Sequence, residues 1–193
     1  MEESAITPRC KVLIIGGSAG SLEILIKILP RINKIPDFAF VIVVHRKSGE
    51  DTTLEELLSI KSVIPVAEVE DKVPLIPGYI YVAPSGYHLL FEKDSTLSLD
   101  ASEKINYSRP SIDVAFESAA EAFGPAVTGI LLSGANADGT NGLIAIKKAG
   151  GITAVQDPAT AEMPFMPQHA VNARQPDYAI KPEDLVGFIS KIL

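Results

Sequence analysis

Apolar runs rich in β-branched residues alternate with stretches of helical periodicity along this chain. Strands are predicted at 11–16, 38–45, 126–134 and 151–156, and helices at 21–29, 51–60, 109–123, 141–149, 167–173 and 182–192. The segment 126–134 is almost continuously apolar, as expected for a strand that is covered on both faces. This alternation predicts an α/β fold in which helices flank a doubly wound, mostly parallel sheet.

The middle of the chain departs from this alternation. Residues 66–71 and 77–84 have the character of extended chain, and the spacing between HLLFEK at 88–93 and STLSLD at 95–100 predicts a hairpin. We therefore expect an antiparallel β-hairpin excursion here rather than a further strand–helix unit.

The composition is that of a globular protein with the size of one ordinary domain. The chain has 193 residues, of which 47% are hydrophobic and 21% charged. We expect a leader at 1–10 and a single domain at 11–193. The one cysteine, Cys10, lies in the leader, which argues against a disulfide framework and a multi-cysteine metal site and favours a reducing compartment. Neither a metal nor a cofactor is predicted.

Charge and hydropathy exclude several classes of partner. The net charge of -7 disfavours non-specific nucleic-acid binding, which needs a basic face. The acidic N-terminus has no apolar core of a secretory signal, and no apolar run approaches the ~20 residues that span a bilayer. We expect a cytoplasmic protein without membrane insertion.

A glycine-rich turn, GGSAG at 16–20, follows the first predicted strand and precedes a helix. It fails the dinucleotide fingerprint GxGxxG, because serines occupy the third and sixth places counted from Gly16. It also lacks the Gly-Lys-Ser/Thr of a phosphate-binding loop. It does match G-x-S-x-G, in which small neighbours let a tight strand-to-helix turn expose a serine hydroxyl. Ser18 is therefore a candidate nucleophile.

A serine nucleophile needs a base and a group that orients the base. His45 ends the second predicted strand, and Asp138 follows the strand at 126–134. Carboxyl ends of parallel strands meet at one edge of a doubly wound sheet, where ligands and catalysis are found. The sequence thus predicts Ser18, His45 and Asp138 at the same edge.

Each of these residues also has a plainer interpretation. Ser18 could be only the N-cap of the following helix. Asp138 lies in ADGTNG at 137–142, where aspartate before glycine often marks only a turn or a helix N-cap. The other two histidines, His88 and His169, are expected to have surface or packing roles.

Several segments together resemble one family, the CheB chemotaxis methylesterases. They cover nearly the whole chain from residue 11, in the order of that family, and the most specific are RPSIDVAF, the SGxxxDGxxGL pattern and QDP…MP. The others are IIGGSAGSLEIL, VIVVH, EDKVPLIPGYIYVAPSGYHL and the residues that surround these patterns.

The resemblance implies a serine hydrolase with Ser18, His45 and Asp138 as its triad. Ser18 would attack the γ-methyl ester of a glutamate on a cytoplasmic chemoreceptor helix, form an acyl-enzyme and release methanol. The same chemistry on a glutamine would be deamidation. The backbone N–H groups of Ala19 and Ala135 are the expected oxyanion donors.

The resemblance further implies that Arg109 and Met166 contact substrate. It also has departures. Ala19 replaces a small hydroxylated residue, Ala135 replaces a frequent methionine, and Arg46-Lys47 follow the histidine where the family usually has an apolar residue and proline. Typical members also carry an N-terminal receiver domain, whereas only ten residues precede residue 11 here. We therefore expect constitutive activity or a separate response-regulator partner.

Two other functions remain open. A patatin-like esterase also uses a glycine-flanked serine and an aspartate before glycine, but it has a glycine-rich oxyanion segment upstream that this chain lacks. An ordinary α/β-hydrolase would have the order Ser…Asp…His rather than the order found here. A non-catalytic module that binds receptors or other signalling proteins is the alternative from a different class.

Overall fold

The computed structural model describes residues 11–46, 53–174 and 176–192. Three features discussed above lie outside the described residues. They are the predicted leader at 1–10, which contains Cys10, then Lys47, and the start of the helix predicted at 51–60.

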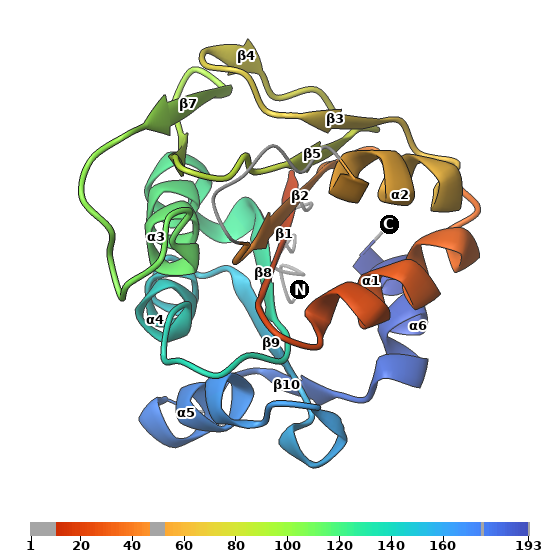
Figure 1. Ribbon diagram of the computed structural model, residues 1–193, viewed down its shortest axis with the longest axis vertical. Helices are drawn as coiled ribbons and strands as arrows, with labels where there is room; N and C mark the ends of the chain where they lie inside the picture. Colours follow the sequence, from red (N-terminus) through yellow and green to blue (C-terminus); the bar gives the residue numbers. More distant parts are fainter. Residues whose placement is uncertain (1–10, 47–52, 175, 193) are drawn as a thin grey trace, which may run out of the picture.

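A seven-stranded sheet, parallel throughout, runs through the centre of the molecule (Figure 1). Its strands in spatial order are β10 (Tyr178–Ile180), β9 (Ile152–Gln156), β8 (Val127–Leu131), β1 (Val12–Gly17), β2 (Ala39–Val44), β5 (Ile80–Val82) and β3 (Val66–Glu68). The predicted doubly wound parallel sheet is therefore confirmed. The strand predicted at 126–134 ends at Leu131. The residues after Leu131 form the loop that leads to the site described below.

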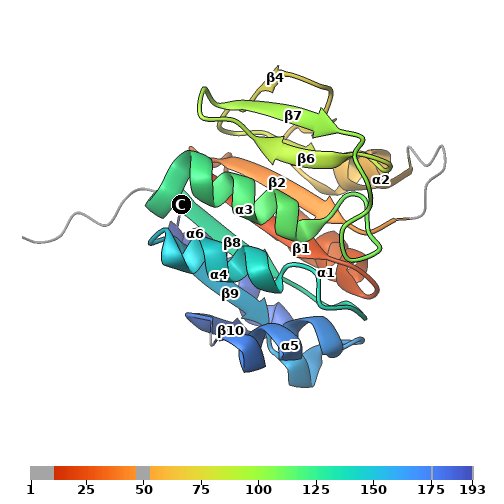
Figure 2. The same ribbon diagram turned by 90° about the vertical axis from the view of Figure 1, so that its left-hand side faces the viewer.

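Helices cover both faces of the sheet. Along β1, Val12 and Ile14 pack into one core and Leu13 and Ile15 into the other, as the two-residue period of a strand requires. The first core is covered by α3 (Ile112–Phe123), α4 (Thr140–Lys148) and α5 (Phe165–Ala173), which face the viewer in Figure 2. The second is covered by α1 (Ser21–Ile28), α2 (Thr53–Lys61) and α6 (Leu185–Ile192).

The predicted hairpin is present as part of a small antiparallel sheet above α3 (Figure 2). Strand β6 (His88–Phe91) pairs with β7 (Thr96–Asp100), and β7 also pairs with β4 (Val73–Pro74). Leu89, Phe91 and Leu97 contribute to the α3 core, so this small sheet closes the first face.

Other parts of the chain differ from the prediction. Strands β3 and β5, in the region expected to leave the parallel sheet, pair in parallel with it, and three-residue β10 was not predicted. The helix predicted from residue 109 begins at Ile112 because the Ser111 side chain caps it, accepting from the Val114 N–H at 3.4 Å. Short 3₁₀ turns complete the fold at Leu29–Arg31, Gly124–Ala126, Pro158–Thr160 and Pro182–Asp184.

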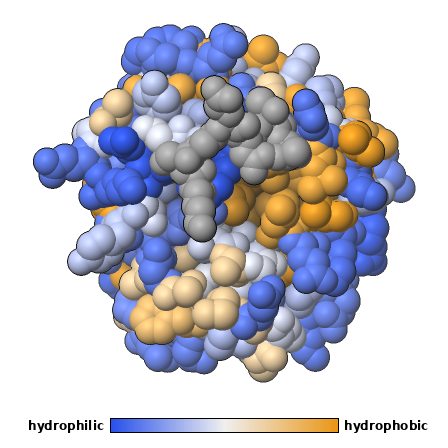
Figure 3. All heavy atoms as spheres, in the orientation of Figure 1, coloured by the Kyte–Doolittle hydropathy of each residue, from blue (hydrophilic) through white to orange (hydrophobic). Residues whose placement is uncertain are grey.

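Part of the molecular surface is apolar. Figure 3 shows apolar side chains gathered over α1 and α2, where Leu22 and Ile60 are exposed. No helix within the described ranges is long and apolar enough to cross a membrane.

Candidate active site

The three predicted residues follow three neighbouring strands, β8, β1 and β2. The His45 N–H donates to the Gly17 carbonyl at 3.0 Å, and the Ser18 N–H donates to the Ser133 carbonyl at 2.9 Å. Ser18 is thus held between the ends of β2 and β8 by continued strand pairing. Asp138 lies further along the loop that follows β8.

The glycine-rich turn does not use Ser18 as a helix cap. The N-cap of α1 is Gly20, whose φ of 82° is left-handed, and no side chain caps that position. Instead the Ser21 hydroxyl donates to the Ser18 carbonyl at 2.6 Å and fixes the turn. The Ser18 side chain is partly buried and its hydroxyl forms no hydrogen bond with any described residue. The N-cap interpretation of Ser18 is therefore wrong.

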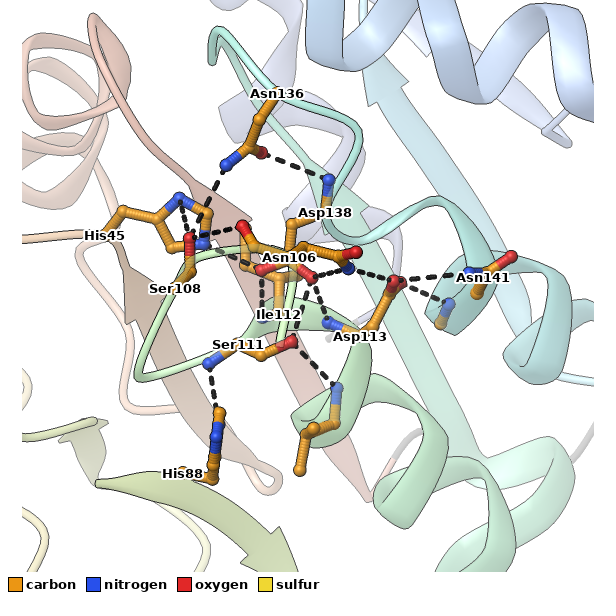
Figure 4. A network of polar contacts seen from close by, with 12 residues as sticks. His45, His88, Asn106, Ser108, Ser111, Ile112, Asp113, Asn136, Asp138 and Asn141 are labelled. Carbon is orange, nitrogen blue, oxygen red and sulfur yellow. Dashed lines mark hydrogen bonds and ion pairs between the residues drawn. The ribbon is translucent and has the colours of Figure 1, made fainter. Parts of the chain in front are cut away.

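His45 and Asp138 form a close pair (Figure 4). The Nε2 atom of His45 lies 2.7 Å from Oδ2 of Asp138, and the two side chains are 12% and 0% exposed. An ionised carboxylate can only accept a hydrogen bond, so Nε2 carries the proton and Nδ1 is left as an acceptor in the neutral ring. The pair therefore leaves Nδ1 as the basic atom.

Asp138 is held at the start of α3 rather than at the start of its own helix, α4. Its carboxylate accepts the backbone N–H groups of Ile112 at 2.7 Å and Asp113 at 3.1 Å, where the helix dipole favours a negative charge. The Ser111 hydroxyl at 2.9 Å and the Asn106 amide at 3.2 Å complete its contacts.

Burial and hydrogen bonding act on the pKa of Asp138 in opposite directions. Burial raises the pKa, whereas the hydrogen bonds from His45, Ile112 and Asp113 lower it, and the result lies below the usual range. Asp138 is therefore ionised at neutral pH. A turn-only or N-cap role in α4 is excluded, because Gly139 caps that helix with a φ of 92° and no side chain bonds there.

The Nδ1 atom of His45 faces Ser108 rather than Ser18. The Ser108 hydroxyl lies 3.4 Å from Nδ1, and the Asn136 amide lies 3.5 Å from the same hydroxyl (Figure 4). Among the described residues, His45 and Ser18 share no hydrogen bond. Catalytic hydrogen bonds are often long in ligand-free proteins and tighten only when substrate binds.

The two predicted oxyanion donors lie in exposed turns on either side of Ser18. In the described part of the chain, the N–H groups of Ala19 and Ala135 have no hydrogen-bond partner. Ser133, two residues before Ala135, links the two turns because its hydroxyl donates to the Ala19 carbonyl at 2.7 Å. The same oxygen accepts the Met163 N–H at 3.0 Å. Two free donors are thus fixed close to the candidate nucleophile.

The residues predicted to contact substrate have other partners in this structure. The Arg109 guanidinium donates to the carbonyls of Ala101 and Ser102 at 2.8 and 2.6 Å and so fixes the loop before α3. Met166 is buried and packs against Gly134. Both contacts stay predictions.

The two remaining histidines have supporting roles. His88 is buried, and its Nδ1 accepts the Ser111 N–H at 3.1 Å, which fixes the residue that caps α3. His169 stacks on Phe165 and its Nδ1 lies 3.0 Å from the Thr140 hydroxyl. These contacts agree with the surface or packing roles expected of the two histidines, since His88 is buried and His169 is exposed. Within the described ranges, no group of three or more His, Cys, Asp or Glu side chains is arranged to hold a metal ion.

Four polar residues of the site were not singled out from the sequence. They are Asn106, Ser108, Ser111 and Asp113, and all belong to the loop before α3 or to the first turn of that helix. Ser111 and Asp113 lie within the motif RPSID, so a polar pair at a helix start was the one available signal.

Several known proteins resemble this chain in sequence. The family model described as CheB methylesterase matches residues 13–189. A putative protein-glutamate methylesterase/protein-glutamine glutaminase of Leptospira interrogans is 43% identical over 186 residues, which cover 94% of each chain. Protein-glutamate methylesterase FrzG of Myxococcus xanthus is 34% identical over 88% of this chain and 51% of its own length.

A solved structure supports the same assignment. The crystal structure of the Thermotoga maritima CheB methylesterase catalytic domain superposes with a TM-score of 0.90 at 29% identity. The match covers 95% of this chain and 99% of that one. The family model, the relatives and the fold therefore show that this chain belongs to the CheB methylesterase family.

Proposed function

We propose that this protein is a serine hydrolase that removes γ-methyl esters from glutamate side chains of methylated chemoreceptors. The observation that carries the proposal is the 2.7 Å pair of His45 and Asp138. His45 follows the strand next to the one that leads to Ser18, whose hydroxyl bonds no described residue. Relatives named protein-glutamate methylesterase/protein-glutamine glutaminase support the choice of ester and extend it to deamidation of glutamine.

The proposed reaction begins when Ser18 Oγ attacks the ester carbonyl. Its proton passes to His45 Nδ1, and the N–H groups of Ala19 and Ala135 donate to the oxyanion of the tetrahedral intermediate. The C–O bond to the methoxy group then breaks, and His45 returns the proton so that methanol leaves. Asp138 stabilises the imidazolium formed between these steps.

The second half of the reaction releases glutamate. A water molecule gives a proton to His45 Nδ1 as its oxygen attacks the acyl-enzyme carbonyl, and the bond to Ser18 Oγ breaks as that proton returns to the serine. With a glutamine side chain the first leaving group would be ammonia, and the product would again be glutamate.

One change of partner must precede the attack. The Nδ1 atom of His45 faces the Ser108 hydroxyl in the structure, so it must exchange this contact for Ser18 when substrate binds. We infer that substrate binding brings about this exchange.

A protein substrate suits the surroundings of the site. Helix α1 begins three residues after Ser18, and the apolar surface over α1 and α2 includes exposed Leu22 and Ile60. Exposed apolar surface of this kind is typical of sites that bind other proteins. A helical chemoreceptor segment would present its esterified glutamate beside such a surface. Control by a separate response regulator stays a prediction.

The test is release of methanol from receptor carrying labelled methyl esters. We expect turnover by the wild type, loss of turnover in Ser18→Ala, and full turnover in Ser190→Ala, a control on the exposed side of α6. Undiminished turnover in Ser18→Ala would overturn the proposal. Receptor binding without any turnover by the wild type would instead favour the non-catalytic module.

A further inference from the structure

Two buried carboxylates of this site share one amide. The Asn106 Nδ2 atom lies 3.0 Å from Asp113 Oδ2 and 3.2 Å from Asp138 Oδ1 (Figure 4). Asp113 and Asp138 are 4% and 0% exposed, so water does not screen one from the other. The mechanism above uses Asp138 and gives Asp113 no task.

Asp113 is placed against the start of α4. Its Oδ1 atom accepts the Gly142 N–H at 2.8 Å, and the Asn141 amide lies 3.5 Å from Oδ2. A Cβ on Gly142 would lie 2.4 Å from Phe116 Cβ and 3.2 Å from Asp113 Cα, so only glycine permits this approach of α3 and α4. The carboxylate therefore sits at the junction of two helices and the active site.

The charged neighbours of Asp113 make its ionisation costly. Burial and the charges of Asp138 and of Glu117 on α3 raise the pKa of Asp113, and the Gly142 and Gly139 N–H groups lower it. The result is a pKa of about 6. His45 bonds Asp138 and not Asp113, so Asp113 has no cation of its own among these groups. A shared donor between the two carboxylates lowers their mutual repulsion.

We propose that Asn106 is a positioning residue that binds both carboxylates at once, and that Asp113 is a second carboxylate of the site whose charge acts on the His45–Asp138 pair. The proposal rests on the proposed function, because it concerns the same base. When Asp113 is ionised, its field favours the imidazolium that forms on His45 during the reaction. Asn106 keeps Asp138 in place while both carboxylates are charged.

The loop that carries Asn106 is built to present this amide. Asn106 and Tyr107 have φ values of 50° and 62°, in the left-handed region that asparagine tolerates better than most residues. Reciprocal backbone hydrogen bonds between Ile105 and Ser108, at 3.2 and 2.9 Å, close the turn around them. The closed turn thereby fixes the backbone that carries the Asn106 amide, just before α3 begins.

Three variants separate the proposed role from a space-filling one. Asn106→Gly removes the amide and keeps the left-handed backbone. Asn106→Asp keeps the shape but replaces the donor by a third carboxylate. Asn141→Ala is the matched control, because it removes an amide near Asp113 that makes no contact with Asp138.

The readouts are the melting temperature and the rate at which a phosphonofluoridate labels Ser18, both at pH 5 and pH 8. At pH 8 we expect Asn106→Asp to have a lower melting temperature and slower labelling than Asn106→Gly, with labelling at least about tenfold slower than in the wild type. The labelling rate of Asn141→Ala should stay within about twofold of the wild-type rate. At pH 5 the deficit of Asn106→Asp should shrink, because the added carboxyl is then protonated and donates as the amide did.

A space-filling role predicts the opposite order, since aspartate has the shape of asparagine and glycine leaves a gap. Milder effects in Asn106→Asp than in Asn106→Gly at pH 8, or equal losses in Asn141→Ala, would overturn the inference. If the wild type is not labelled at Ser18, the proposed function fails, and the order of melting temperatures still decides the role of the amide.

Discussion

Ile112 and Asp138 join the first turn of α3 to the active site. The Ile112 N–H donates at 2.7 Å to Oδ2 of Asp138, the same oxygen that lies 2.7 Å from His45 Nε2. One carboxylate oxygen therefore orients the catalytic base and satisfies a helix N–H that would otherwise be buried without a partner. The orientation of His45 depends on the start of a helix that lies 26 residues before Asp138 in the chain.

Replacing Asp138 by Asn should damage both the reaction and the fold. The amide carries one acceptor where the carboxylate accepts five hydrogen bonds, so a helix N–H or the ring of His45 loses its partner. We expect turnover to fall by about 10³–10⁴-fold and the free energy of unfolding to fall by about 1–3 kcal/mol. Methanol release and urea unfolding measure these, with exposed Asp184→Asn as the control. Activity within tenfold of the wild type would contradict this role.

Asp113 should make stability depend on pH. Its pKa is raised from 3.8 to about 6 in the folded protein, so the protonated form is favoured by folding. The stability that it contributes is complete below pH 4 and is lost as the pH rises through 6, by about 3 kcal/mol in total. Asp113→Asn removes this titration. The difference in unfolding free energy, variant minus wild type, should therefore rise between pH 4 and 7 in urea titrations, and a flat difference would contradict the assignment.

Removal of the Ser108 hydroxyl should leave Ser18 reactive. The hydroxyl competes for Nδ1 of His45 at 3.4 Å, and a hydrogen bond of this kind is worth about 0.5–1.5 kcal/mol. We expect Ser108→Ala to be labelled at Ser18 as fast as the wild type or up to about tenfold faster. Peptide mapping after labelling checks the position. Label on Ser108 in the wild type, or loss of labelling in Ser108→Ala, would mean that Ser108 takes part in the chemistry.

Gly134 should not accept a larger residue. A Cβ there would lie 2.5 Å from Met166 Cε and 3.0 Å from Ser18 Cβ, so Gly134→Ala displaces a buried side chain and the nucleophile together. We expect about 1–3 kcal/mol of lost stability and slower labelling of Ser18. The double variant Gly134→Ala, Met166→Ala should recover part of the stability relative to Met166→Ala alone. Gly187→Ala, where the added atom meets open space, is the control.

Much of this arrangement could be predicted from the sequence. The parts that could not be predicted lack a local sequence signal for physical reasons. The apolar runs located β1, β2 and β8, and the rule that carboxyl ends of parallel strands meet brought Ser18, His45 and Asp138 to one edge. Strands β3, β5 and β10 have three residues each, too few for a periodic signal.

The contacts of Asp138 could not be predicted in the same way. Its position before Gly139 suggested a turn or a cap of α4, whereas its carboxylate bonds the start of α3. Asn106 and Ser108 lie in a loop without periodicity, and only the tertiary fold brings them to Asp138 and His45. Local sequence does not contain that information.

The most direct test of the account is whether His45 activates Ser18. A phosphonofluoridate is incubated with the wild type, Ser18→Ala, His45→Ala and the control His169→Ala, and the modified peptide is identified by mass spectrometry. The account predicts one label, on Ser18, that is absent from Ser18→Ala, at least about 10²-fold slower in His45→Ala and unchanged in His169→Ala. Labelling of Ser18 at the wild-type rate in His45→Ala, or no labelling of the wild type, would contradict it.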